Sequence, residues 1–199
     1  MIGRTEGDLQ FPLDGRMSAR HVEITLQVVG GSHRWVITDL QSTHGMFVRV
    51  SKTPLADRAE ILVGGGRYRF EAAQVVDDRT IDQPGHAGPD TARTQGLDEA
   101  TAQFRPAALT ELIGREIGNR IVLVKDEYWI GSDPACAIGR ADDPFCEGRH
   151  VRIARNRKGQ WVAEHHKTQN GLWLRMSQIP ADSQVMFQVG EQRFRLRVD

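Results

Sequence analysis

Hydrophobic and polar residues alternate along short segments in the first part of the chain. Between Arg20 and Val28, aliphatic residues occupy every second position from Val22 onward, and polar or charged residues lie between them. A period of two with one apolar face is typical of a half-buried β-strand. No segment before residue 77 sustains the 3.6-residue period of a helix, so this part is predicted to be all-β. The expected strands are 20–28, 35–40, 46–50, 61–63 and 67–71.

The composition changes between residues 77 and 106, where glycine, proline and charged residues replace most aliphatic ones. Such a segment buries too little apolar surface to offset its ordering entropy, so we predict a flexible linker. The chain is therefore predicted to contain two domains, residues 1–76 and 107–199, joined by the linker 77–106. The strand-like segments of the second domain are 108–114, 119–124, 127–130, 149–154, 160–164, 172–176 and 192–198.

The two predicted domains share landmark residues in the same order, which indicates an internal repeat. A nearly constant spacing over this many landmarks means two copies of one fold. The slightly larger spacings near the start imply that one hairpin is about three residues shorter in the second copy. The pairs are Trp35 and Trp161, Gly45 and Gly171, Val63 and Val189 at a spacing of 126, Gly3 and Gly131 at 128, and His21 and His150 at 129.

Three polar motifs of the first copy fall in predicted turns. Gly3-Arg4 precedes the first alternating segment, Ser18 stands three residues before His21, and Ser42–Gly45 forms a polar turn. A phosphate dianion offers acceptor oxygens that a guanidinium and a hydroxyl on preorganised turns can bind. Arg4 and Ser18 would converge on such an anion only if the fold brings their loops to one end of the domain.

In this order and at these spacings, the motifs resemble those of the forkhead-associated (FHA) domain, a β-sandwich that binds phosphothreonine. Because the pattern is repeated, the chain resembles a tandem FHA protein of the bacterial type, with two FHA-like β-sandwiches. His44 replaces the family's asparagine that holds the peptide backbone, and an imidazole lacks the donor and acceptor pair of an amide. The resemblance implies that Arg4, Ser18, Arg20, Thr43 and His44 bind the phosphopeptide, and that Gly3, His21 and Gly45 shape the site.

The second copy keeps the frame of this site but changes its polar groups. Ser132 stands where the first copy has Arg4, and Glu147 stands where it has Ser18. A carboxylate beside a phosphate costs on the order of 1–4 kcal/mol in a partly desolvated site. We therefore predict that the second copy does not bind phosphothreonine by this route. Its degenerate site consists of Ser132, Glu147, His150 and Asn170.

The first copy begins later in the fold than the second. About two predicted strands precede Gly131 in the second copy, whereas only Met1 and Ile2 precede Gly3 in the first. The first domain is therefore expected to lack its leading strands and to expose the backbone groups that they would cover. Upstream residues, the linker, a partner chain or a neighbouring copy could supply them, and the last would make a homo-oligomer through the missing-strand edge.

Composition and charge narrow the range of functions. With 26 basic and 26 acidic residues, the chain has no net charge, so no global field favours nucleic acid. No apolar run reaches the ~18–20 residues of a membrane span. Cys136 and Cys146 are too few for a disulfide framework, so we expect a reduced, cytoplasmic protein. No zinc-ligand spacing and no nucleophile elbow occurs, so we expect no metal, no cofactor and no enzymatic activity.

Two functions are consistent with these patterns. In the first, the chain is a phosphothreonine-dependent adaptor. Its first domain binds a threonine-phosphorylated protein, either a Ser/Thr kinase or its substrate, and its second domain is a non-phospho interaction surface. In the second, the chain is a phospho-independent scaffold, such as a cytosolic component of a bacterial secretion or signalling assembly. An ordinary turn at Ser18 and His21 is the alternative to any anion site, and a hydrolase dyad of these residues is disfavoured.

Overall fold

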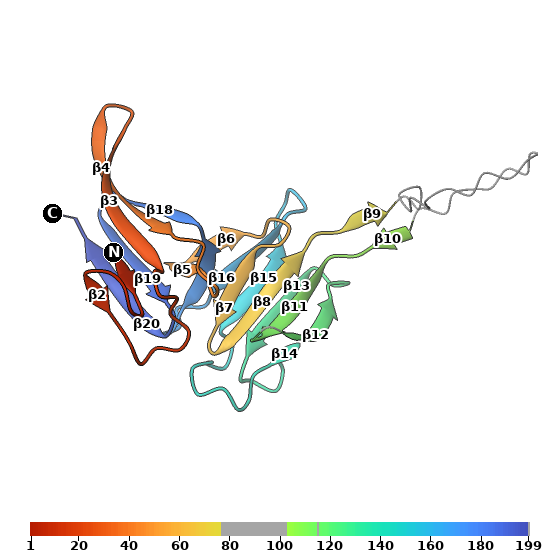
Figure 1. The fold of residues 1–199 in the computed structure, drawn as a ribbon. Coiled ribbons are helices and arrows are strands. Elements are labelled where there is room, and N and C mark those ends of the chain that lie inside the picture. The colour runs from red at the N-terminus through yellow and green to blue at the C-terminus, as the bar shows by residue number, and fades with distance from the viewer. Residues whose placement is uncertain (77–102, 115, 199) are drawn as a thin grey trace, which may run out of the picture.

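The computed structural model describes residues 1–76, 103–114 and 116–198, and every regular element among them is a β-strand. The predicted all-β fold is therefore confirmed. Figure 1 shows two bodies side by side, and one eight-stranded sheet runs through both. In spatial order, this sheet consists of β12 (Glu116–Val122), β11 (Ala108–Ile113), β8 (Gly66–Glu71), β7 (Glu60–Val63), β17 (Leu172–Met176), β5 (Met46–Val50), β19 (Gln184–Val189) and β20 (Gln192–Arg197).

A five-stranded sheet packs on each half of the long sheet, so each body is a two-layered sandwich. One consists of β18 (Gln178–Ala181), β4 (Ser32–Asp39), β3 (Val22–Val29), β1 (Ile2–Gly3) and β2 (Leu9–Gln10). The other consists of β14 (Ile138–Gly139), β13 (Glu127–Gly131), β15 (Val151–Arg155), β16 (Trp161–His165) and β6 (Lys52–Pro54). A separate two-stranded ribbon pairs β9 (Gln74–Val76) with β10 (Gln103–Arg105).

Alternation along each strand decides which side chains enter the two cores. In β8, Tyr68 and Phe70 point inward and are 1% and 2% exposed, whereas Arg67 and Arg69 point away. In β3, Val22 is fully buried on the side that faces the long sheet. The period of two in the sequence therefore separates side chains that face the core between the two layers from side chains that face outward.

The two repeats exchange their C-terminal strands. The strands β6, β7 and β8 come from the first repeat but pair with β16, β17 and β11 of the second. In return, β18 pairs with β4 and β19 pairs with β5. We call the sandwich of β1–β5 and β18–β20 the terminal body, and that of β6–β8 and β11–β17 the central body. Both chain ends lie in the terminal body (Figure 1).

An approximate twofold axis relates the two bodies. β5 and β17 pair antiparallel at the centre of the long sheet, where Val48 lies opposite Leu174. These two residues are equivalent positions of the repeat, because both belong to the series spaced by 126. The axis therefore passes through this pair, and the chain has the arrangement of a domain-swapped dimer within one polypeptide.

The two cores are built across the sequence boundaries predicted at residues 76 and 107. Ile61, Val63, Tyr68 and Phe70 belong to the core of the central body although they precede residue 76. Phe187 and Val189 belong to the core of the terminal body together with Ile2 and Val22. The hairpins 60–71 and 184–197 carry similar alternating patterns, so the sequence pattern alone does not specify which core each hairpin enters.

Most of the predicted linker, residues 77–102, lies outside the described residues. Its last part differs from the prediction, because Gln103–Arg105 form strand β10 and pair with Gln74–Val76. Extended backbone on the two sides of a long connection satisfies its polar groups by pairing. In the part of the chain that the structure describes, no helix is long and apolar enough to cross a membrane.

Candidate functional site

The first predicted motif is brought to the second by backbone contacts at the end of β1. The Arg4 N–H donates to the Ser18 carbonyl at 2.8 Å, and the Glu6 N–H donates to the Ala19 carbonyl at 3.0 Å. Gly3 allows this approach, since a Cβ there would lie 2.1 Å from the Ala19 oxygen. The backbone of Arg4 and that of Ser18 are therefore adjacent, as the anion-site hypothesis requires.

The Ser18 side chain is oriented by the turn that follows β4. The Thr43 N–H donates to the Ser18 Oγ at 3.1 Å. This bond uses a lone pair of the hydroxyl, so its proton is left for donation to a ligand. Arg4, Arg20 and Thr43 are exposed, and His44 is half-buried. Within the described residues, neither the Arg4 nor the Arg20 guanidinium makes a hydrogen bond or an ion pair.

His21 holds these loops together from below. Its Nδ1 accepts the Ser18 N–H at 3.1 Å, and its Nε2 donates to the Gly45 carbonyl at 3.1 Å. The ring is fully buried, and burial lowers its pKa below the usual value, so the neutral tautomer with the proton on Nε2 fits both bonds. His21 contacts the amide of Ser18 and not its hydroxyl, which is the contact of a brace and not of a general base.

The polar turn itself is fixed by two residues that the sequence motifs did not single out as functional. The Ser42 Oγ donates to Asp39 Oδ1 at 2.5 Å and accepts the Gly45 N–H at 3.0 Å. Gly45 has φ of +79°, a conformation that other residues rarely adopt. A serine three residues before a glycine is the signal that identifies this turn, and it places Thr43 and His44 at the surface beside Ser18.

Arg175 reaches the same turn from the other repeat. A Cβ on Gly45 would lie 2.3 Å from the Nε of Arg175, which stands in β17. The symmetric contact also occurs, because Arg49 of β5 donates to the carbonyls of Thr168 and Gln169 at 3.2 and 2.9 Å. Each turn is thus approached by an arginine of the other repeat, about 130 positions away for Gly45 and about 120 positions away for Thr168 and Gln169, and no local sequence signal reveals this.

We call the buried histidine, together with the loop and the turn that it bonds, the frame of each copy. The second copy builds the same frame. The Ser132 N–H donates to the Glu147 carbonyl at 3.0 Å. His150 is fully buried, accepts the Glu147 N–H on Nδ1 at 3.0 Å, and donates from Nε2 to the Gly171 carbonyl at 2.9 Å. Every bond of the His21 brace therefore has its counterpart, as the repeat in the sequence predicts.

The polar groups held by this second frame differ. Glu147 Oε1 accepts the Gln169 N–H at 2.6 Å, in the place of the Ser18 hydroxyl. Asn170 is engaged within the chain, since its Nδ2 donates to the Phe145 carbonyl and its Oδ1 accepts from Arg193, both at 3.0 Å. The second frame presents a carboxylate and an amide that is already bonded, which suits a phosphate poorly.

The cysteines carry no reactive chemistry. Cys136 and Cys146 are both free and buried. Burial raises the pKa of the Cys146 thiol to about 11, so it stays protonated near neutral pH. Within residues 1–76, 103–114 and 116–198, no three His, Cys, Asp or Glu side chains gather in a way that would hold a metal ion.

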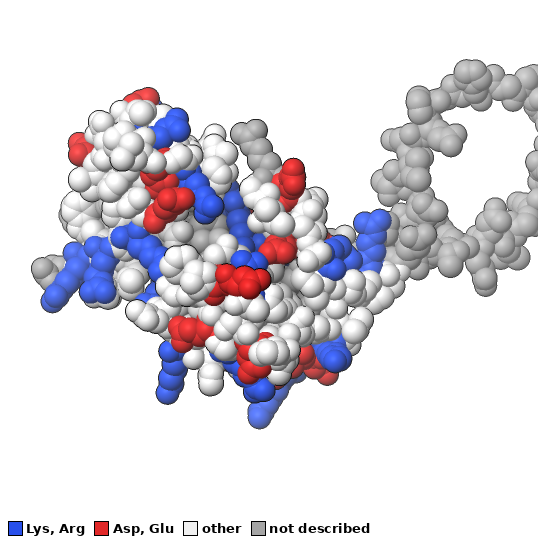
Figure 2. All heavy atoms as spheres, turned by 90° about the horizontal axis from the view of Figure 1, so that it is seen from below, with Lys and Arg blue, Asp and Glu red and all other residues white. Residues whose placement is uncertain are grey.

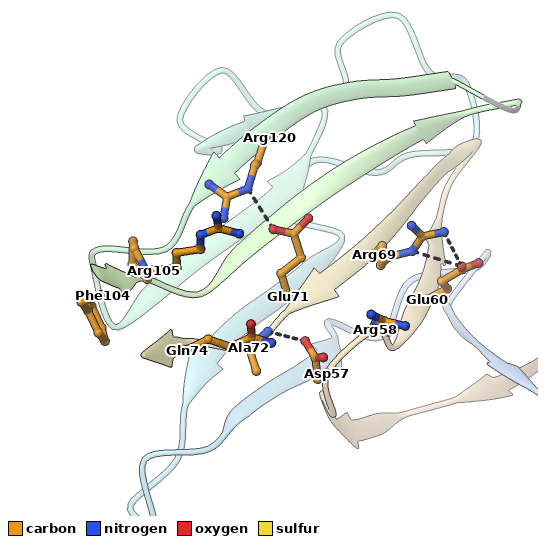
Figure 3. Close-up of a pocket in the computed structure, with 11 residues that line it drawn as sticks. Asp57, Arg58, Glu60, Arg69, Glu71, Ala72, Gln74, Phe104, Arg105 and Arg120 are labelled. Carbon is orange, nitrogen blue, oxygen red and sulfur yellow. Dashed lines mark hydrogen bonds and ion pairs between the residues drawn. The ribbon is translucent and has the colours of Figure 1, made fainter. Parts of the chain in front are cut away.

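A pocket away from both frames includes none of the predicted site residues. It has a volume of about 880 Å³ and lies beside the ribbon of β9 and β10. Figure 3 shows that Arg69 and Arg120 are each bonded to a glutamate there, whereas Arg58 and Arg105 are not. Most of its lining side chains are charged and the apolar ones are few, namely Ala72, Phe104 and Pro106, whereas pockets that bury small molecules are mostly apolar.

Comparison with known proteins gives one match, in the first part of the chain. The sequence model of the FHA domain matches residues 1–64, so this part of the chain contains an FHA domain. FHA domains are phosphothreonine-binding modules for protein–protein interaction and not enzymes. No curated protein and no solved structure matches the chain. The matched range ends inside the β7–β8 hairpin, which the structure assigns to the central body.

Proposed function

We propose that the protein is a phosphothreonine-dependent adaptor of tandem FHA type, in which the first copy binds a threonine-phosphorylated partner. The observation that carries the proposal is the Ser18 hydroxyl, which accepts the Thr43 N–H and donates to no described residue. Arg4 is exposed, and its backbone N–H donates to the Ser18 carbonyl, so the two residues lie next to each other. A hydroxyl donor and an unpaired guanidinium on fixed loops form a receptor for a phosphate dianion.

In this proposal, Arg4 and Ser18 bind the phosphate, Thr43 lines the site, and Arg20 adds positive charge from the adjacent position of the loop. His44 takes the place beside the peptide backbone. The partner is a Ser/Thr kinase or its substrate, and the protein acts in the cytoplasm of a bacterial cell. The second copy is an interaction surface that does not depend on phosphate, because its frame holds Glu147 where the phosphate ligand Ser18 stands in the first.

A phosphothreonine-peptide library titrated against the full chain tests this proposal. Ser18→Ala and Arg4→Ala each remove one charge-assisted bond, so each should weaken the best peptide by about ten- to a hundredfold, or roughly 1.5–3 kcal/mol. Arg157→Ala is the matched control, because Arg157 is exposed in the turn between β15 and β16. Equal binding by wild type and both variants, or binding of unphosphorylated peptides, would refute the proposal.

A phospho-independent scaffold is the second candidate, and the strand exchange favours it. The exchange joins both bodies through one continuous sheet, which suits a rigid building block as well as a reader of phosphate. His44 and Glu147 further reduce the groups available for a phosphopeptide. Absence of any phosphothreonine-dependent binding in the library titration is the result expected for a scaffold.

A further inference from the structure

The long sheet ends differently in the two bodies. At one end, β8 is covered by β11, which pairs with it over four residue pairs, and β12 then covers β11. The repeat places β20 where β8 stands, since both begin 126 residues apart at Gly66 and Gln192. No strand among the described residues pairs with the outer side of β20. Among the described residues, every other strand of the central sandwich has its counterpart in the terminal body, and only the hairpin of β11 and β12 has none.

The side chains of β20 are less buried than those of β8, as expected for a strand at the edge of the sheet. Along β8, the inward residues are buried and the outward ones are half-buried. Along β20, the inward residues are only half-buried and the outward ones are exposed. Phe194 and Leu196, the counterparts of Tyr68 and Phe70, remain partly open at the border of their core although they pack on it. The burial pattern therefore agrees with an edge of β20 that no described strand covers.

The backbone of β20 offers a defined set of unpaired groups. Its hairpin with β19 has Val189 opposite Gln192 next to the turn, and the Val198 N–H donates to the Ser183 carbonyl. The inner hydrogen bonds therefore belong to Gln192, Phe194, Leu196 and Val198. The N–H and C=O groups of the alternate residues Arg193 and Arg195 point to the open edge.

The same alternate residues make the outward face of this edge basic. Figure 2 shows basic side chains gathered at the end of the molecule that carries β20. Arg193 donates to Asn170 and Gln188, whereas Arg195 has no hydrogen bond or ion pair with the described residues. A covering strand would place every second side chain beside these arginines and the remaining ones over Phe194 and Leu196.

We propose that the edge of β20 binds a strand of a partner protein in which acidic and apolar residues alternate. Backbone pairing supplies the contact, the apolar residues close the core at Phe194 and Leu196, and the acidic ones lie beside the arginines. A second copy of β20 fits poorly, because antiparallel self-pairing would bring the arginines of both copies together on one face. This site is independent of the Ser18 site, so the chain carries two separate binding surfaces.

Two synthetic peptides of equal length test the proposal on the wild-type full chain. One has the core Glu-Val-Glu-Val-Glu and the other Lys-Val-Lys-Val-Lys, and fluorescence anisotropy measures their binding. We expect the acidic peptide to bind at least tenfold more tightly, and Ser18→Ala to leave this binding unchanged. Absence of binding by the acidic peptide, or equal binding by the basic one, would overturn the proposal.

Variants at position 195 separate backbone pairing from charge. Arg195→Pro removes an outward N–H without breaking the hairpin with β19, so the acidic peptide should bind at least tenfold more weakly. Arg195→Gln keeps the N–H and should lose only a few-fold. Unchanged circular dichroism would show that both variants fold. Full binding by a folded Arg195→Pro variant contradicts strand pairing, and a wild-type dimer that Arg195→Pro dissociates would identify a second copy as the occupant.

Discussion

At the scale of single residues, one buried histidine frame supports two different chemical surfaces. His21 and His150 make the same pair of bonds, from the N–H of a loop residue and to the carbonyl of a turn glycine. The polar groups beside the frame differ between the copies, with a hydroxyl at Ser18 in the first and a carboxylate at Glu147 in the second. The framework therefore tolerates different side chains at this position, since the same histidine bonds form beside Ser18 and beside Glu147.

The buried brace predicts a pH dependence of stability. Burial lowers the pKa of folded His21, whereas the unfolded side chain titrates near ~6.5. Below that pH the unfolded state binds more protons, so stability is full above it and falls as pH drops, by at most about 1.4 kcal/mol per pH unit for one site. Urea unfolding between pH 5 and 7.5 should give a shallower pH profile for His21→Gln than for wild type.

Two other histidines, His165 and His33, help to interpret this pH profile. His165 contributes a slope of the same sign, because burial also lowers its pKa, and this residue stays in the variant. His33→Gln, in the exposed hairpin of β3 and β4, should leave the profile unchanged. Identical slopes for wild type and His21→Gln would show that the neutral brace is not linked to folding.

At the scale of elements, the alternating pattern predicted most strands, but it did not predict their pairing. Tyr68 and Phe70 in one hairpin, and Phe194 and Leu196 in the other, present the same inward pattern. A pattern shared by both hairpins cannot specify which core each one enters. The backbone contacts of Gly3, Ser18 and the turn at Gly45 were predictable as motifs, whereas the approach of Arg175 depends on the exchange.

Glu60 of β7 links β8 and β17, so substituting it measures how much these contacts between exchanged strands contribute to the free energy of unfolding. It is 6% exposed, and its carboxylate accepts bonds from Arg67 and Arg69 of β8 and from Arg175 of β17, the last at 3.2 Å. Burial opposes its charge, but these arginines hold the pKa of Glu60 below its usual range. Its stabilisation is therefore lost only when pH falls through that lowered pKa.

Glu60→Gln should lower the free energy of unfolding by about 1–3 kcal/mol, because three arginines lose one buried partner. The control is Glu71→Gln, whose ion pair with Arg120 is more exposed and should cost less than about 1 kcal/mol. Urea unfolding at neutral pH measures both. Equal losses for the two variants would argue against a special role for the Glu60 cluster.

At the scale of the whole molecule, the exchange gives each repeat a share of both cores, so we expect the two repeats to unfold as one unit. The first repeat supplies four side chains to the core of the central body, namely Ile61, Val63, Tyr68 and Phe70. The second repeat supplies β19 and β20 to the terminal body. Burial of those four side chains alone is worth on the order of 6–12 kcal/mol before costs. The Ser18 frame thus stands on a sandwich that the last strands of the chain complete.

Cutting the chain between the repeats tests this interdependence. A protease site inserted between Pro89 and Asp90 lies outside the described strands, so cleavage should leave the pairing of β5 with β17 and of β8 with β11 intact. The two pieces should then remain together as one particle of about the full 22.3 kDa in native mass spectrometry, and separate only in denaturant. Two repeats folded on their own hairpins would instead part on cleavage, because the strands that cross between them would be absent, and that outcome would exclude the exchange.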